Sequence, residues 1–295
     1  MKTHLLLTAL LACTAGAPAF AATPINETRP LDARGHVEVS NVKGRIEVRT
    51  WDRAEVGITG QLGKGVERLQ IEGDRGNLEI KVRYPRNSRN TEPTTLLLNV
   101  PRQANLDISG VAAAIDVSGI AGDELDIESV SGNVVAIGAP RSAEISSVSG
   151  HLRLNLNSRD IDIETVSGNI SLRGRIDGGI AAETVSGDIS IDTRGEAARK
   201  LSTSSVSGNA HFVGALAEGG RISAESVSGD IRLTLPQSLS ARVRAESFSG
   251  NLSAPGVSVS RPKYGPGSSF EHTYGSGSGE IRLETFSGNA ELALE

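Results

Sequence analysis

The chain has 295 residues, a formal net charge of −5, 34 glycines and only 3% aromatic residues. Such a mildly acidic chain, without a run of Lys and Arg, lacks the basic surface that nucleic-acid binding needs, so no nucleic acid is expected as a partner. Scarce aromatics and abundant glycine favour narrow β-structure over a broad mixed core.

The N-terminal 21 residues have the pattern of a secretory signal peptide. Lys2 precedes an apolar run over residues 5–12, and small residues follow at Ala19 and Ala21. We predict cleavage after Ala21 and export to the periplasm or the extracellular space. Two alternatives stay open: processing as a lipoprotein before Cys13, and retention as an anchor. No later stretch approaches 18 apolar residues, so we predict no membrane span in the mature chain.

Residues 22–34 are polar and carry two prolines, and we expect them to be a disordered lead-in. From residue 35 apolar residues alternate with polar ones, as in His36–Ser40, which predicts strands with one buried face. We interpret residues 35–105 as irregular β coils. No stretch shows a sustained helical period, so very little helix is expected.

A short repeat organises the rest of the chain. The quartet [Ser/Thr]-[Val/Phe]-Ser-Gly occurs eight times, at spacings of 18, 18, 19, 21, 21, 21 and 38 residues. A repeat of this length indicates stacked units that cannot bury their apolar faces alone. The quartets end at Gly132, Gly150, Gly168, Gly187, Gly208, Gly229, Gly250 and Gly288.

Each repeat has room for two strands, one after the quartet (residues 169–172) and one before the next quartet (residues 179–185). We therefore predict an all-β fold. Residues 106–295 form a β-solenoid, or parallel β-helix, of 18–21-residue coils whose strands pair in parallel about 4.8 Å apart. Right-handed winding is expected by analogy with parallel crossovers.

The 38-residue spacing predicts a loop at 255–278 that is inserted into one coil. The segment is rich in Gly, Pro and Ser and holds Tyr264, Phe270 and Tyr274, in a chain with few aromatics. Because aromatic side chains anchor interfaces, this loop is our candidate interaction site. The alternative is a tolerated insertion without a role.

Three columns of the repeat predict structure more than chemistry. We expect the quartet glycines to take positive φ at a tight corner. The following column is Asn or Asp in seven of eight coils, which fits hydrogen bonding at a turn and a ladder between coils better than a row of metal ligands. Six of the eight residues four positions before each glycine are Glu. We interpret them as a solvated acidic ridge; the alternative is a weak surface for divalent cations or cationic glycans.

The Val/Phe column raises a question of phase. Alternation along residues 163–166 puts Val166 on the outer face with Glu164, yet all eight members are apolar. Either the corner turns these side chains inward, or the solenoid carries an exposed apolar ridge. We expect them to point inward, because exposed apolar stripes of that size are rare unless they bind something.

We find no catalytic constellation. The chain has no Gly-x-Ser-x-Gly elbow, and His36, His151, His211 and His272 are scattered without ligand spacing. We predict no catalytic, cofactor-binding or metal-ligating residues.

The Trp51-Asp52 step before a strand, the Leu-x-Leu-x-Val-Pro join at residues 96–101 and the serial Ser-Gly-[Asn/Asp]-Ile units resemble the bacterial putative-adhesin domain family. The resemblance covers residues 35–295. It implies a secreted or membrane-attached β-solenoid without an assigned activity, and it implies no catalytic residues.

We therefore expect a non-enzymatic exported β-solenoid that acts as an adhesin or cell-envelope interaction protein, with an unknown protein or glycan as its partner. The alternatives are a protein-binding component of envelope stress or regulation and, less favoured, a polysaccharide-active enzyme on a β-helix.

Overall fold

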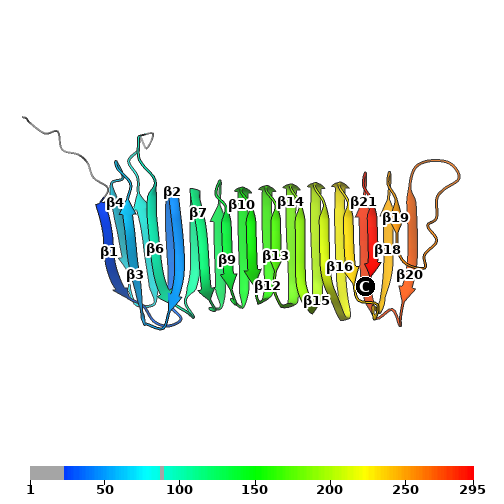
Figure 1. Cartoon of the computed structure of the whole chain (residues 1–295), viewed down its shortest axis with the longest axis horizontal. Coiled ribbons are helices and arrows are strands. Elements are labelled where there is room, and N and C mark those ends of the chain that lie inside the picture. The colour runs from blue at the N-terminus through cyan, green and yellow to red at the C-terminus, as the bar shows by residue number, and fades with distance from the viewer. Residues whose placement is uncertain (1–22, 87–89) are drawn as a thin grey trace, which may run out of the picture.

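The computed structural model describes residues 23–86 and 90–295, so the predicted signal peptide lies outside the described residues. The described chain is a long stack of strands that stand side by side along the whole molecule (Figure 1). It contains no helix and hence no helical segment able to cross a membrane. The prediction of an all-β solenoid is confirmed.

The 22 strands form one continuous hydrogen-bonded sheet that is folded into two layers. Long strands such as β2 and β16 pass through both layers, because they pair with different partners in their first and second halves. In spatial order, the first layer holds β4 (Arg68–Gly73), β5 (Asn77–Arg83), β2 (His36–Trp51), β7 (Asn105–Ile120), β8 (Glu124–Ser129), β10 (Ser142–Ser149), β12 (Ser158–Ser167), β14 (Ile176–Ser186), β15 (Ile189–Ser207), β16 (Ala210–Ser228), β21 (Gly279–Thr285), β18 (Ala241–Ser247) and β20 (Ser268–Tyr274).

The second layer holds the first-layer strands that cross the corner and those confined to the other side of the coil. In spatial order these are β1 (Thr23–Pro30), β3 (Glu55–Leu62), β6 (Thr94–Pro101), β2, β7, β9 (Val134–Gly138), β11 (Leu152–Leu156), β13 (Ile170–Arg173), β15, β16, β17 (Ile231–Leu235), β22 (Ala290–Leu294) and β19 (Leu252–Ser253). From β7 onward every strand pairing is parallel, as the spacing predicts, except that of β20 with β18. The direction in which the coils wind stays a prediction.

The core is a narrow apolar column between the layers. Val, Ile, Leu and Ala from alternate positions of each strand point inward and are almost fully buried, as Ile161 and Ile163 are in β12. The outward residues of the same strands are exposed, so one coil buries its apolar face only against the coils beside it. This is the physical reason for the repeat.

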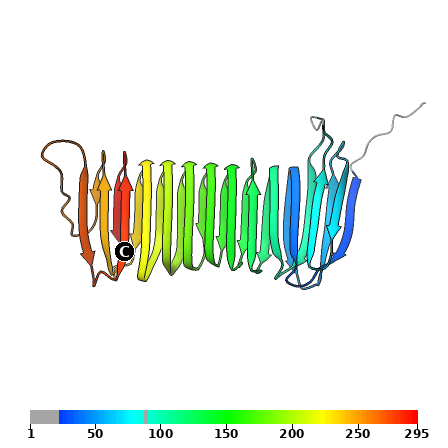
Figure 2. The ribbon, with the colours of Figure 1, turned by 180° about the vertical axis from the view of Figure 1, so that it is seen from behind.

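Spatial order departs from chain order at both ends. Strand β2 lies between β5 and β7, although β3 to β6 come after it in the chain. Strand β21 lies between β16 and β18, so the last coil returns to fill a place inside the stack. Figure 1 shows β21 inside the stack and β20 at its end, and Figure 2 shows the same order from behind.

Two boundary expectations differ from the structure. The lead-in at 22–34 was expected to be disordered, but β1 pairs antiparallel with β3 along its whole length, because an edge strand leaves backbone groups that an added strand satisfies. The segment 255–278 was expected to be a loop, but β20 pairs antiparallel with β18 and covers the other end. Residues 254–267, between β19 and β20, form the long connection at that end (Figure 1).

Candidate functional site

The corner of each coil after the first quartet is closed by glycine packed on glycine, and the first quartet glycine, Gly132, packs on Ala113. A Cβ atom on Gly168 would lie 2.0 Å from the carbonyl oxygen of Gly150, and one on Gly208 would lie 1.9 Å from that of Gly187. The φ angle is positive at only two of the eight glycines, Gly187 and Gly208. The expected reason for glycine was therefore wrong at the other six, where the need is space between coils.

The Asn/Asp column beside the glycines forms a ladder along the stack. The backbone N–H of each member donates to the side chain of the previous one, for example Asp188 to Asn169 Oδ1 at 3.1 Å and Asn289 to Asp230 Oδ1 at 2.8 Å. His151 takes part, since its Nδ1 accepts the Asn169 N–H at 3.4 Å. The ladder supports the structural reading of this column.

The tight corner leaves the Val/Phe column outside. The inward position before it holds Ser or Thr, so the next side chain points to solvent, and Val166 is 49% exposed while Thr165 is 5% exposed. The expectation that these residues point inward was wrong: the corner does not reset the alternation. Strand register continues the column into β2 and β7, and we call the row the apolar ridge. It consists of Val42, Val111, Val130, Val148, Val166, Val185, Val206, Val227, Phe286 and Phe248.

The apolar ridge holds most of the exposed large hydrophobic side chains among the described residues. Ten of the twelve large hydrophobic side chains that are exposed among the described residues belong to it. At its end the rings of Phe286 and Phe248 stack with centroids 4.7 Å apart. A shallow groove follows the ridge from β2 to β15, lined by the ridge side chains and by outward residues such as Glu128 and Glu164. A second groove continues it over Val227 and the two phenylalanines.

Beside the first half of the ridge, the outer face of the first layer is acidic. From β2 to β12 its outward positions before the ridge carry nine carboxylates, and Arg159 at the start of β12 is the one exposed Lys or Arg among them. We call this set the acidic face. It consists of Glu38, Asp107, Glu124, Asp126, Glu128, Glu144, Asp160, Asp162 and Glu164.

These carboxylates are crowded and almost without counter-charges. Among the described residues only Asp160 has an ion-pair partner, its chain neighbour Arg159 at 3.7 Å. Asp126 shows the consequence: partial burial, then the neighbouring Asp107 and Glu144 and the two glutamates of its own strand, raise its pKa to about 6. The described residues hold no group of three or more His, Cys, Asp or Glu arranged to bind a metal ion.

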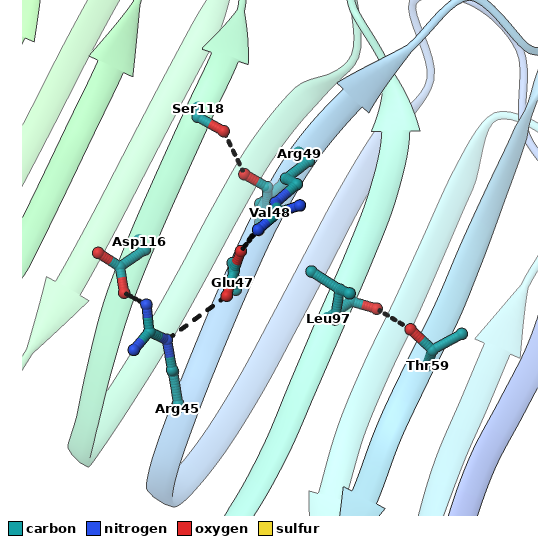
Figure 3. Close-up of polar contacts among 8 residues, drawn as sticks. All are labelled: Arg45, Glu47, Val48, Arg49, Thr59, Leu97, Asp116 and Ser118. Carbon is teal, nitrogen blue, oxygen red and sulfur yellow. Dashed lines mark hydrogen bonds and ion pairs between the residues drawn. The ribbon is translucent and has the colours of Figure 1, made fainter.

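In the second layer the outward carboxylates are paired with arginines. Near the same end of the molecule, Arg45 lies 2.8 Å from Asp116 and 3.6 Å from Glu47, and Arg49 donates to Glu47 at 2.8 Å (Figure 3). Acidic side chains there are neutralised by arginines on the same strand or the next one. The acidic face is thus a property of one side of the molecule.

The candidate loop does not present its three aromatics together. Phe270 lies on β20 and is 5% exposed, packed in the core at the end of the stack. The Tyr274 hydroxyl donates to the Pro255 carbonyl at 2.7 Å, and its ring meets His272 edge-on. Only Tyr264 is fully open, at 84% exposed. Phe270 and Tyr274 therefore hold the cap in place, because they close the end of the core.

Sequence reasoning identified the Val/Phe and Glu columns but missed most of the acidic face. Asp107, Asp126, Glu144 and Asp162 lie opposite one another in adjacent strands, as the register shows. The signal was present, since three of them stand six positions before a quartet glycine, where later coils hold Ala, Ser or Arg.

The comparisons with known proteins agree with this architecture. The model of the Toastrack DUF4097 family matches residues 26–218 and 213–293. The chain belongs to this family. It is the family of the putative-adhesin resemblance, which is thereby confirmed.

One of the similar solved structures shows the same fold at low identity. A protein from Parabacteroides distasonis described as a putative adhesin is 13% identical, with a TM-score of 0.53, over 92% of this chain and 98% of that one. A putative lipid binding protein from the same organism is 14% identical, with a TM-score of 0.49, over 90% and 96% of the two chains. A putative adhesin from Bacteroides fragilis is 12% identical, with a TM-score of 0.44, over 94% and 99%. A search of curated proteins finds no match.

Proposed function

We propose that this Toastrack protein is an exported, non-enzymatic binding scaffold of the cell envelope, an adhesin or interaction protein, and that the apolar ridge is its contact surface. The ridge is the observation that carries this proposal. Monomeric proteins rarely expose a contiguous apolar strip, and such strips mark binding sites. Ten aligned side chains at a strand spacing of about 4.8 Å make a strip roughly 43 Å long.

The design of the coil supports a role for the ridge beyond folding. The inward positions supply the core, and the glycine corner and Asn/Asp ladder join the coils, so an exposed Val is not needed for either task. A polar residue at this position would leave the packing intact. Every coil nevertheless carries Val or Phe there, which supports selection for binding.

Export rests on the N-terminal sequence pattern, and the absence of an assigned activity in the family favours binding over catalysis. An adhesin uses such a surface for a cell or matrix, and a regulatory component would use it for another protein. Both readings share the ridge, so one experiment tests the part they have in common.

The test measures binding of the immobilised protein to bacterial envelope fractions. The variant V148T/V166T/V185T makes the middle of the ridge polar while keeping β-branched residues that suit strands. The control variant V135T/I137T/V213T makes three outward apolar residues of the second layer polar. We expect the ridge variant to lose most of the binding and the control to keep it. Equal binding by both variants would show that the ridge is not the contact surface.

A further inference from the structure

The apolar ridge restricts how a partner binds. Strand β12, for example, is hydrogen-bonded to β10 on one side and β14 on the other, so its backbone offers no free donors or acceptors. A partner therefore cannot add a strand to the sheet at the ridge. It must bind through side chains, over the groove that runs along the ridge.

The spacing of the ridge suits a helix. Adjacent ridge side chains are separated by the distance between strands, about 4.8 Å. A helix advances about 5.4 Å per turn, whereas an extended chain advances about 6.6–6.8 Å between side chains on one face. A helix lying along the groove thus places close to one turn over each coil, and its apolar stripe meets the ridge side chains in succession.

The acidic face determines the charge of that helix. Its carboxylates flank the ridge from Val42 to Val166, and eight of the nine have no ion-pair partner among the described residues. Like charges in adjacent strands repel one another, so a partner that brings cations removes an existing cost as well as adding attraction. An anionic lipid surface would be repelled by the same residues.

A second copy of this chain fits this half of the ridge poorly. Two acidic faces brought together would add repulsion. In the antiparallel arrangement the acidic face would meet the C-terminal half of the other copy, where Arg221, Arg244 and Arg282 already pair with Glu280, Glu246 and Glu284. Only Lys200 and Arg242 are left there without an ion-pair partner among the described residues, too few to neutralise nine carboxylates.

We infer that the partner of this surface presents a cationic amphipathic helix, which lays its apolar stripe on the ridge between Val42 and Val185 and its Lys or Arg side chains on the acidic face. This inference rests on the proposed function and adds the chemical class of the partner. Six ridge residues at about 4.8 Å span roughly 24 Å. At 1.5 Å per residue this corresponds to a helix of about 16 residues.

The test uses a synthetic helical peptide of about 18 residues made of Leu and Lys with an amphipathic pattern, labelled for fluorescence anisotropy. One control peptide has the same composition in a scrambled order, and another has Glu in place of Lys. Circular dichroism of the bound peptide reports its helix content. Binding to zwitterionic and anionic vesicles tests whether a lipid surface occupies the ridge. Sedimentation of the protein alone tests whether a second copy does.

Two variants with matched chemistry locate the site. D126N/E144Q/D162N removes three negative charges from the middle of the acidic face. E225Q/E246Q/E284Q removes the same number of negative charges beside the other half of the ridge. We expect the first to weaken binding of the Leu/Lys peptide about tenfold or more and the second to change it less than about threefold. Binding should also weaken as salt rises from roughly 50 to 500 mM, because screening shortens the reach of the charges.

Several results would overturn the inference. With the peptides, the inference fails if the Leu/Lys peptide does not bind, or if the Leu/Glu or the scrambled peptide binds equally well. With the variants, it fails if both weaken peptide binding to the same extent. It also fails if zwitterionic vesicles bind at the ridge, or if the protein forms a dimer that V148T/V166T/V185T abolishes. The proposed function fails separately, when the ridge variant retains its binding to envelope fractions. If the ridge variant loses its binding to envelope fractions but the parent protein shows no preference for cationic peptides, the ridge is still the contact surface and only the cationic helix is rejected.

Discussion

The two halves of the first layer share one scaffold and differ in charge. From β2 to β12 the outward positions before the ridge carry nine carboxylates, with Arg159 at the start of β12 as the one cation beside them. From β15 to β18 the same positions carry Lys200, Arg221, Arg242, Arg244 and Arg282 among glutamates. The apolar ridge runs through both halves and the quartet glycines run from β8 to β18, so the main difference between the outward positions of the two halves is their charge.

This difference shows which positions the fold leaves free. A solenoid coil is specified by its inward residues and its corner, and the outward columns accept acidic, basic or small residues without a change in register. Crowded carboxylates destabilise the acidic half to some extent, as the raised pKa of Asp126 indicates. Charge kept at such a cost supports a role in recognition.

The largest expected effect belongs to the corner and should be the same in both halves. Gly168→Ala places a methyl group 2.0 Å from the Gly150 carbonyl oxygen, and Gly229→Ala places one 2.1 Å from that of Gly208. Because both clashes are with backbone, we expect each variant to lose about 3 kcal/mol of unfolding free energy. Urea denaturation measures the loss.

Ser167→Ala and Ser228→Ala are suitable controls, since both serines are exposed beside the altered glycines, and we expect them to change stability little. A large loss for Gly168→Ala with none for Gly229→Ala would mean that the two halves do not share one scaffold. The comparison between them would then no longer isolate charge.

Much of the fold follows from the sequence because the repeat is local. Alternation gives the strands, the quartet gives the corner, and the spacing of about 20 residues gives two strands per coil. The order of the strands at the ends does not follow, because β21 and β2 are placed by long-range pairing that no local pattern specifies. Strand β20 illustrates this, since its seven residues lie inside the segment 255–278, which was expected to be an inserted loop, but they form a strand that caps the stack.

The candidate site was harder to predict from the sequence than the fold. Two rules disagreed about Val166: the alternation along the strand predicts an outward side chain, and the tendency of apolar residues to be buried predicts an inward one. The side chain points outward, because the alternation of inward and outward residues continues into the corner. The acidic face depends on which residues from five strands lie side by side, and this needs the register. Tyr264 kept its predicted exposure, whereas Phe270 was drawn into the core by the open end of the stack.

The next largest expected effect is a pH-dependent change in stability that should differ between the two halves because of their charge. Asp126 has a raised pKa, so its ionised form is less stable in the fold than in the unfolded chain. Its cost is absent below the unfolded pKa of 3.8, grows between 3.8 and about 6, and is complete above that. After allowance for solvent screening we expect Asp126→Asn to raise the unfolding free energy by about 1 kcal/mol at about pH 7. The gain should disappear near pH 4, and urea denaturation at both pH values checks it.

Glu284→Gln provides the counterpart in the other half. Glu284 accepts a hydrogen bond of 2.6 Å from Arg282 Nε and raises the pKa of that guanidinium, so its removal leaves a cation without its partner. We expect little change or a small loss of stability, with no gain at neutral pH. A gain for Glu284→Gln as large as that for Asp126→Asn would mean that both halves carry the same electrostatic cost.

The smallest expected effect concerns the hydroxyl column directly beneath the ridge, which both halves share. Thr165, Thr184 and Thr285 are buried, and their Oγ1 atoms have no hydrogen-bond partner among the described residues. Val has the same shape and removes an unpaired polar group, so we expect Thr184→Val to leave stability unchanged or to raise it by at most about 1 kcal/mol. Thr165→Val in the acidic half and Thr285→Val in the other half should behave alike, because the corner around them is the same. Thermal unfolding of the three variants checks this. A loss confined to Thr165→Val would show that the hydroxyl has a partner only where the carboxylates crowd, and the charge difference would then extend from the surface into the coil.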